Sequence, residues 1–521
     1  MANKRIFRNA MGKIAPATNM VNEAGGRAYQ FAPKAALAQY AVTGVFNGTY
    51  YVSAKTQLDK IQEYLAKVND AAFVAKLAVY ARKQGFMKDM PAFLLAHLAS
   101  RSDGRRLFDR VFDQVIDNGK MLQNFVQVMR SGVVGRNSLG SMAKRKVKGW
   151  FNRDPDWIFK NSIGSNPSLA DILKLSHPHP LTKKHEALFA YLLGKDAKKR
   201  SLPALVKAYE KFKANPDRAE VPKVPFQFLA SLDIPEKVWK EIAKNGGWHM
   251  VRMNLNTFAR HGVLDDEYMV ELIADKLRDE DQIRRSRVFP YQLMTAFMNA
   301  RDVPSDISLA LQDAMEIATQ NVPAFGKNVY VFPDVSGSMS SPVTGYRRGS
   351  TSKVNCIDVA ALVAATVLRT TPQAEVIPFE CRALKARLNP RDSIMTNAKK
   401  LARMGGGGTN CSAPLEQVER SGKKVDLVIY VSDNESWVDS SRSRYYNDST
   451  ATMKIWKKIK RKNPNAKMVC IDITPYDSTQ APDSKDILNV GGFSDQIFTV
   501  IDEFVNGSEE HWVDVIERVE V

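Results

Sequence analysis

Cysteine is scarce in this chain of 521 residues, and its four cysteines form no C-x-x-C pair. This spacing excludes a zinc ribbon and a disulfide scaffold, and it favours a reducing compartment. Long apolar runs are missing as well, since no window offers the roughly 18 apolar residues that a membrane-spanning helix needs. The basic N-terminal stretch, residues 1–16, lacks the apolar segment of a secretory signal. We therefore expect a cytoplasmic protein without membrane association.

Acidic residues are too few to balance the basic ones. The chain has 75 lysines and arginines against 56 aspartates and glutamates, a formal net charge of +19. Residues 1–325 carry +17 of this excess and residues 326–521 only +2. A basic surface confined to one part of a protein indicates a polyanionic partner. The alternative is a solvated surface that only keeps the protein soluble.

Alternation of β-branched residues is almost absent between residues 20 and 320. Instead, apolar residues recur at helical spacing, as in Ala71–Phe86, Met90–Ser100 and Gly104–Gly119. Helices of this length joined by short turns are typical of stacked α-hairpins of the HEAT kind. No strict sequence period accompanies them, so this prediction depends on the rhythm of the helices.

The pattern changes near residues 321–327. From there, short apolar runs alternate with helical segments, and the strands are expected at 328–332, 374–379, 425–432 and 467–473. Such alternation predicts a parallel, doubly wound α/β sheet. We therefore expect a multidomain α plus α/β protein, with a helical module over residues 1–322 and a Rossmann-like domain over residues 326–521.

Three oxygen-rich segments fall at the predicted carboxyl ends of strands or in loops of that sheet, where ligands of such folds bind. The first is the D-x-S-x-S turn with Asp334, Ser336 and Ser338, the second a glycine loop ending in Thr409, and the third contains Asp433. Together they have the pattern of a metal-ion-dependent adhesion site in a von Willebrand factor A domain.

These residue types suit a hard divalent cation, most simply Mg²⁺, which takes about six oxygen ligands. Two carboxylates and neutral hydroxyls would leave an open position that attracts an anion. One alternative is a serine-rich turn that caps the next helix. A phosphate loop is disfavoured because the glycine loop lacks the required lysine. A catalytic metal is disfavoured too, because no histidine or glutamate base accompanies the segments.

Basic side chains cluster at a few places, where they could neutralise RNA phosphates. The candidate RNA-binding residues are Lys144, Arg145, Lys146, Lys148, Lys160, His177, Arg284, Arg285 and Arg287. Neighbouring aromatics such as Trp150 and Phe151 could stack on unpaired bases. For each aromatic taken singly, however, a place in the helix core is the favoured interpretation.

Several segments resemble the Ro autoantigen family in its bacterial or phage-type form, whose members combine a TROVE module with a von Willebrand A domain. The likeness is carried by Gln39–Leu58 with its G-T-Y-Y, by Ala170–Pro180 with S-H-P-H-P, by Ser286–Phe297, and by the D-V-S-G-S-M that starts at Asp334. The resemblance implies that His177 occupies an RNA-contacting histidine position and that Lys160 lies near a basic one.

The resemblance implies a ring of HEAT-like repeats closed by the A domain. It further implies that a small Y-type non-coding RNA binds the basic surface, and that single-stranded 3′ ends of misfolded or structured RNA enter the central hole. It also implies RNA quality control beside an exoribonuclease.

Three functions compete on the residues alone. The first is an RNA-binding scaffold without catalysis, expected as a monomer. The second is an adaptor whose metal site captures an acidic protein partner. The third is a metal-dependent nuclease, for which a base and a second metal site are missing in the sequence. The charge difference favours the first, because an adaptor has no need for +17 on its helical part.

Overall fold

The computed structural model describes residues 15–521 except positions 45, 165, 197–198, 287, 289, 301, 347–352, 439–448, 493–495 and 507–510. Its contacts divide the chain into two compact units. The sheet unit comprises Met1–Asn69, Glu280–Asn299 and Leu311–Arg518. The helical unit comprises Asp70–Asp279, Ala300–Ala310 and Val519–Val521. Each unit is described by itself.

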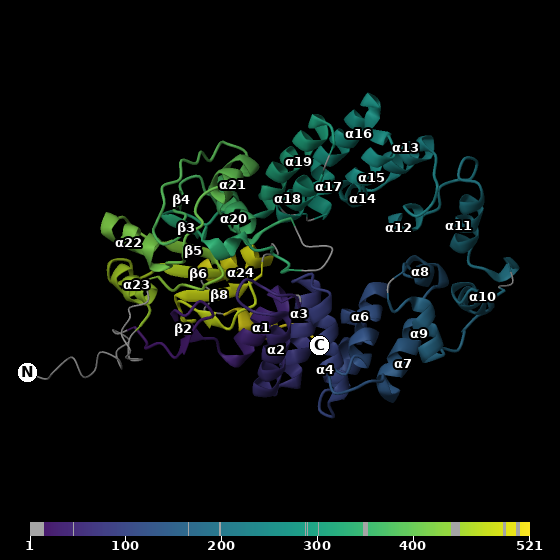
Figure 1. Cartoon of the computed structure of the whole chain (residues 1–521), viewed down its shortest axis with the longest axis horizontal. Coiled ribbons are helices and arrows are strands. Elements are labelled where there is room, and N and C mark those ends of the chain that lie inside the picture. The colour runs from purple at the N-terminus through teal and green to yellow at the C-terminus, as the bar shows by residue number, and fades with distance from the viewer. Residues whose placement is uncertain are drawn as a thin grey trace, which may run out of the picture. The chain divides into compact units, whose positions relative to one another are not determined.

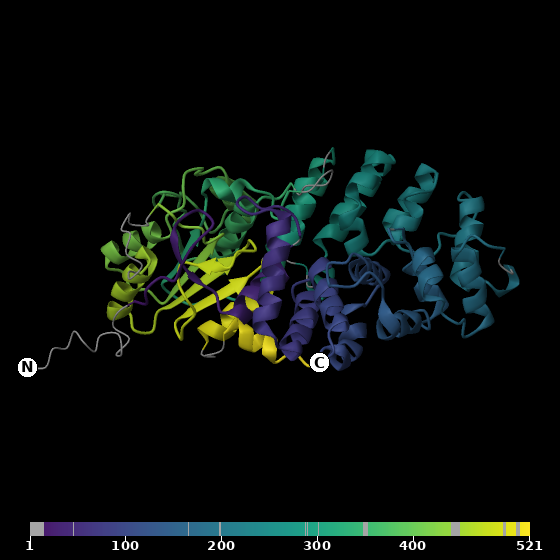
Figure 2. The same ribbon diagram turned by 60° about the horizontal axis from the view of Figure 1, so that its bottom comes forward.

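The helical unit consists of short helices that follow one another as neighbouring pairs (Figures 1 and 2). They are α3 Ala71–Lys83, α4 Asp89–Ser100, α5 Arg105–Val115, α6 Gly119–Arg130, α7 Gly140–Trp150, α8 Pro155–Lys160, α9 Leu169–Ser176, α10 Lys183–Leu192, α11 Ala204–Ala214, α12 Phe226–Leu229, α13 Glu236–Asn245, α14 Trp248–Met253, α15 Leu255–Arg260 and α16 Glu267–Arg278. Two 3₁₀ turns, Lys199–Ser201 and Val263–Asp265, also belong to this unit, as does the start of α19 Ser305–Ala318. The predicted helical fold class is confirmed. Among the described residues, no helix combines the length and apolarity needed to cross a bilayer.

Capping side chains stabilise the first turns of several of these helices, and aromatic side chains pack between neighbouring helices. Asn118 caps α6 because its side chain accepts a hydrogen bond from the Met121 N–H, which satisfies one of the unpaired donors of the first turn. Phe108 and Phe112 of α5 pack against Phe125 of α6, with ring centroids 5.7 and 5.6 Å apart. All three rings are fully buried. The apolar stripes predicted from the sequence therefore meet between neighbouring helices.

The sheet unit contains a parallel sheet in the order β4-β3-β5-β6-β8. The strands are β3 Val329–Pro333, β4 Glu375–Val376, β5 Leu427–Ser432, β6 Lys467–Asp472 and β8 Ile487–Gly491. Four of them lie where the apolar runs predict them, and the α/β fold class is confirmed. The sequence did not reveal β8, because this short strand contains a buried asparagine, Asn489, and ends in glycine.

Helices cover both faces of the sheet (Figure 1). Alternate residues of the strands, such as Phe332 and Tyr430, share an apolar cluster with Trp456 of α23, while α20 contacts β3 and β5. The remaining helices are α17 Glu280–Ser286, α18 Pro290–Asn299, α19 Ser305–Ala318, α20 Cys356–Thr370, α21 Ile394–Ala402, α22 Ser412–Ser421, α23 Ala451–Lys462, α24 Gln496–Val505 and α25 Trp512–Glu517, with 3₁₀ turns at Thr319–Asn321 and Gly337–Ser340.

The N-terminal segment packs with the sheet unit. It forms β1 Met20–Val21, β2 Arg27–Gln30, α1 Pro33–Thr43 and α2 Ala54–Val68, and β2 pairs antiparallel with β7 Ser478–Thr479. The Gln39 side chain of α1 donates to the main-chain carbonyls of Asp472 and Thr474 at 3.3 and 3.1 Å. The compact units therefore divide the chain differently from the predicted boundary at 322–326. The cause is a pairing between strands far apart in the sequence, which no local pattern announces.

Candidate metal centre and basic surface

The D-x-S-x-S turn follows β3 directly and is held by its own first residue. The Asp334 carboxylate is fully buried and accepts a hydrogen bond from the Ser336 N–H at 2.8 Å. Its other oxygen accepts from the hydroxyl of Ser432, at the end of β5, at 2.5 Å. The hydroxyl oxygens of Ser336 and Ser338 lie 3.2 Å apart. The turn is thus anchored to the neighbouring strand and presents its oxygens together.

The glycine loop lies against this turn because glycine is the residue that fits there. Gly405 has a φ of +81°, and a Cβ at this position would stand 2.1 Å from the Val335 carbonyl oxygen. The Gly337 N–H donates to the Gly407 carbonyl at 2.8 Å. Thr409 at the end of the loop is buried, and its carbonyl accepts from the Trp437 N–H at 3.1 Å. The loop therefore contacts both other segments.

Asp433 supplies the second buried carboxylate. It follows β5, is 2% exposed, and accepts from the Glu435 N–H at 3.3 Å. Burial raises the pKa of Asp433. Burial, and then the negative charge of Asp433, raise the pKa of Asp334. Two carboxylates buried close together repel each other, and a cation between them would relieve that repulsion.

The donor set therefore fits a hard divalent cation. All five residues predicted for the metal, Asp334, Ser336, Ser338, Thr409 and Asp433, are buried at the carboxyl edge of the sheet. They would offer two carboxylates and three hydroxyls, the ligand type that Mg²⁺ prefers. Among the described residues, no group of three or more histidines, cysteines, aspartates or glutamates is arranged to hold a metal. Any ion here would thus depend on hydroxyl ligands.

The sequence pattern did not identify two residues that lie at this edge of the sheet. Tyr51 belongs to the N-terminal segment; burial, and then the charge of Asp433, raise its pKa, while a hydrogen bond with Ser338 lowers it. Glu435 is fully buried and accepts from the Ala24 N–H at 3.1 Å. Burial, followed by the charge of Asp433, raises the pKa of Glu435 to about 8. The G-T-Y-Y motif contained Tyr51, but nothing in it pointed to the sheet edge.

The basic run on α7 is partly neutralised within the protein. Arg145 and Lys146 each lie 3.4 Å from the Asp109 carboxylate of α5. Trp150 and Phe151 are buried in the core, as the favoured interpretation of each aromatic predicted, so neither ring stacks on a base in this conformation. Lys144 and Lys148 are half-buried on the same helix.

Lys160 and His177 are exposed at helix ends of the helical unit. Lys160 is the last residue of α8, and His177 caps α9 in the left-handed conformation with a φ of 51°. The neighbouring His185 differs, because it is buried and both its ring nitrogens are engaged. They lie 2.8 Å from the Thr182 hydroxyl and 3.0 Å from the Arg153 carbonyl.

The second cluster of predicted arginines belongs to the segment Glu280–Asn299 of the sheet unit. Arg284 and Arg285 are exposed on α17, and Arg284 forms an ion pair with Glu280 at 2.7 Å. Arg287 lies outside the described residues. The predicted RNA-binding set is therefore divided between the two compact units.

Comparisons with known proteins identify two family domains in this chain, whose matched ranges overlap at residues 329–375. The family model described as TROVE domain matches residues 223–375, and that described as Ro60 vWA domain matches residues 329–505. The chain is 24% identical to a protein of Deinococcus radiodurans named RNA-binding protein RO60, over 93% of this chain and 95% of that protein. A Caenorhabditis elegans protein of the same name is 25% identical over 50% of this chain and 40% of its own length. The crystal structure of the Deinococcus radiodurans RO (RSR) protein matches 91% of this chain and 100% of that chain, with a TM-score of 0.63 and 21% identity.

Proposed function

Because this chain belongs to the Ro family, with a TROVE domain followed by a Ro60 von Willebrand factor A domain, we propose that it binds RNA and is not itself an enzyme. One observation carries the proposal. Residues 70–279, the main part of the helical unit, hold 36 basic and 23 acidic residues, and Lys160 and His177 are exposed there. Relatives of similar sequence are named RNA-binding proteins.

The partner in this proposal is structured RNA with an unpaired 3′ end, together with a small non-coding RNA of the Y type. Lysine and arginine neutralise phosphates in any sequence, which suits a protein that receives many different defective RNAs. Exposed basic residues at helix ends can follow a flexible single strand more readily than a rigid duplex. A role beside an exoribonuclease in RNA quality control, in the cytoplasm and as a monomer, follows as the finer part of the proposal.

The test compares two RNAs with the same stem-loop, one blunt and one with a single-stranded 3′ tail. Filter binding should give the tailed RNA at least about tenfold higher affinity, which corresponds to about 1.4 kcal/mol. The Asp334→Ala protein serves as the matched control, because the candidate metal site belongs to the nearly neutral part of the chain, residues 326–521. It should bind tailed RNA like the parent. Equal affinity for both RNAs would contradict recognition of the tail.

A second candidate function is favoured by the buried carboxylate pair. Asp334 and Asp433, with the hydroxyls of Ser336, Ser338 and Thr409, would hold Mg²⁺ at the sheet edge. The bound ion would present an open position to a carboxylate, so that the A domain acts as an adaptor for an acidic protein partner. The Asp334–Ser432 hydrogen bond joins the turn after β3 to the last residue of β5, which directly precedes Asp433.

Thermal unfolding with and without Mg²⁺ tests the metal site. A ligand at 100 times its dissociation constant stabilises the folded state by about 2.7 kcal/mol, so Mg²⁺ should raise the unfolding temperature of the parent. Asp334→Asn removes one charge and should abolish this effect. Ca²⁺ serves as the comparison ion, because Mg²⁺ requires shorter and stricter coordination. An equal rise for parent and variant would contradict the site.

A further inference from the structure

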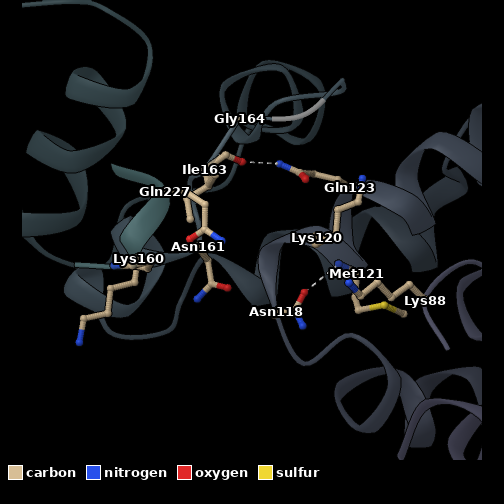
Figure 3. A pocket seen from close by; sticks show the side chains of 11 residues that line it. Lys88, Asn118, Lys120, Met121, Gln123, Lys160, Asn161, Ile163, Gly164 and Gln227 are labelled. Atoms are coloured by element: carbon tan, nitrogen blue, oxygen red, sulfur yellow. Dashed lines mark hydrogen bonds between the residues drawn. The ribbon is translucent and has the colours of Figure 1, made fainter. Parts of the chain in front are cut away.

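A cavity of about 480 Å³ lies in the helical unit, among the ends of several helices (Figure 3). Figure 3 shows Lys88 and Lys120 on one side of it and Lys160 with Gln227 on the other. This volume lies within the range of about 300–1,000 Å³ that is typical of small-molecule sites. The cavity is therefore large enough for one small ligand.

The lining of the cavity is positively charged. It includes three lysines, and none of the described residues that line it is acidic. The nearest carboxylates in the sequence have partners of their own, and Asp117 also accepts a hydrogen bond from Asn118, a lining residue, at 2.8 Å. Asp117 forms an ion pair with Arg82 at 2.8 Å, and Asp89 accepts a hydrogen bond from Asn124 at 2.8 Å. The side chains that line the cavity therefore carry a net positive charge, which favours an anion.

Hydrogen bonds and a close backbone approach hold the wall of the cavity where α6 begins. The Gly119 N–H donates to the Asn161 side chain at 2.8 Å, and a Cβ at Gly119 would stand 2.2 Å from the Asn161 carbonyl oxygen. The Asn161 amide nitrogen donates to the Trp157 carbonyl at 2.9 Å. These contacts fix the wall between α6 and α8 and engage both the amide oxygen and the amide nitrogen of Asn161.

Two glutamines have hydrogen-bonding capacity to spare. Gln123 is 2% exposed, and its amide nitrogen donates a long hydrogen bond of 3.4 Å to the Ile163 carbonyl. Within the part of the chain that the structure describes, its amide oxygen accepts no hydrogen bond. Gln227 is exposed on α12 and also lines the cavity. The Gln123 amide oxygen is not among the fully buried polar atoms that lack a partner, so it can accept a hydrogen bond from a ligand that enters the cavity.

We propose that this cavity binds a single unpaired nucleotide. Lys88 and Lys120, on one side of the cavity, contact its phosphate, and the amides of Gln123 and Gln227 contact the polar edge of its base. Met121 and Pro225 supply apolar surface for the base. Phosphate contacts position a nucleic acid, whereas contacts to base edges are specific. The combination of lysines with amides therefore indicates a nucleotide and not a phosphate alone. The inference rests on the proposed RNA binding and adds a site that distinguishes unpaired from paired residues.

Ligand-observed NMR titrations of the full chain test the cavity without using long RNA. The probes are the four 5′-mononucleotides and ribose 5-phosphate, which has the phosphate and sugar but no base. At least one nucleotide should bind about tenfold more tightly than ribose 5-phosphate. Lys88→Ala should weaken both kinds of probe. Gln227→Ala should weaken the nucleotide alone, because the glutamine contacts the base.

Two controls keep the outcome clear. Lys211→Ala removes an exposed lysine of α11 outside the cavity lining and should bind all probes like the parent. Gln123→Met keeps the volume of the buried side chain but removes its amide, and it should repeat the effect of Gln227→Ala. Equal binding of ribose 5-phosphate and nucleotides, or unchanged binding by Lys88→Ala, would overturn the proposal. RNA binding with no mononucleotide binding refutes the cavity alone, and the reverse refutes the proposed function alone.

Discussion

At the scale of single residues, His97 on α4 gives the helical unit a defined response to acid. Burial, and then the positive charge of Arg101, lower the pKa of His97 to about 4. The folded state therefore binds this proton more weakly than the unfolded state, whose pKa is about 6.5. The stabilising contribution is complete above pH 6.5 and is lost as the pH falls from 6.5 to 4.

We expect His97→Gln to remove this dependence. Between pH 7 and pH 4.5 the parent should lose about 2 kcal/mol more stability than the variant, after allowance for partial exposure. Urea unfolding followed by circular dichroism at both pH values measures the difference. His179→Gln, at an exposed position, is the control and should behave like the parent. Parallel losses in parent and His97→Gln would show that His97 does not titrate in this range.

The sequence could predict that oxygen-bearing residues share one turn, but it could not predict which basic residues form ion pairs within the protein. Asp334, Ser336 and Ser338 lie in one turn, so their proximity follows from the local sequence alone. The pairing of Arg145 and Lys146 with Asp109 joins two different helices, and no local pattern contains it. The burial of Glu435 depends on Ala24, which is distant in sequence. The local sequence can therefore predict which residues share a turn, whereas contacts between distant segments depend on the tertiary structure.

At the scale of elements, the glycine loop determines how closely it can pack against the D-x-S-x-S turn of the candidate metal site. Gly405→Ala combines an unfavourable positive φ with a contact of 2.1 Å to backbone. It should cost about 3 kcal/mol or more and should weaken any stabilisation by Mg²⁺. Gly422→Ala is the matched control, because its φ is +66° but nothing lies within 4 Å of the added Cβ.

Thermal unfolding with and without Mg²⁺ separates the two glycine variants. Gly422→Ala should cost only about 1–2 kcal/mol, the price of the left-handed conformation, and should keep the full Mg²⁺ effect. Equal losses of stability in both variants would show that the close approach of Gly405 to the Val335 carbonyl does not affect the free energy of unfolding.

Elements with strong periodicity were predictable and short polar ones were not. The runs that form β3, β5 and β6 are continuous and apolar, as expected for strands buried on both faces. By contrast, β2 and β7 have four and two residues. Their pairing is decided by the tertiary structure around them. Their sequences carry too little hydrophobic pattern to indicate a strand.

At the scale of the whole molecule, the N-terminal segment completes the sheet unit. Tyr64 of α2 donates to the Asp477 carboxylate at 2.7 Å, and Lys60 lies 2.8 Å from the same carboxylate. Asn22 donates to the Ser436 carbonyl at 2.8 Å. A fragment that begins at residue 326 would lose these partners, although the family model for the A domain begins only at residue 329.

We therefore expect the fragment 326–521 to unfold at a lower temperature than the sheet unit within the full chain. Differential scanning calorimetry measures this, and a peptide of residues 15–69 added in trans should raise the fragment's unfolding temperature. A peptide of the same composition in scrambled order is the control. Equal unfolding temperatures of the fragment and the full chain would mean that the segment contributes nothing to stability.

The measurement that tests RNA binding by the basic helical unit most directly is affinity for a single-stranded 3′ tail across four salt concentrations. The parent should show a steep log–log dependence on salt. Lys160→Ala should reduce the slope by about 0.7, the value for one phosphate contact on a single strand. His177→Ser should weaken binding with little change in slope, since a neutral imidazole releases no counterion. Lys211→Ala is the control for loss of a lysine elsewhere. Identical binding constants for the parent, Lys160→Ala and His177→Ser at every salt concentration would contradict this assignment.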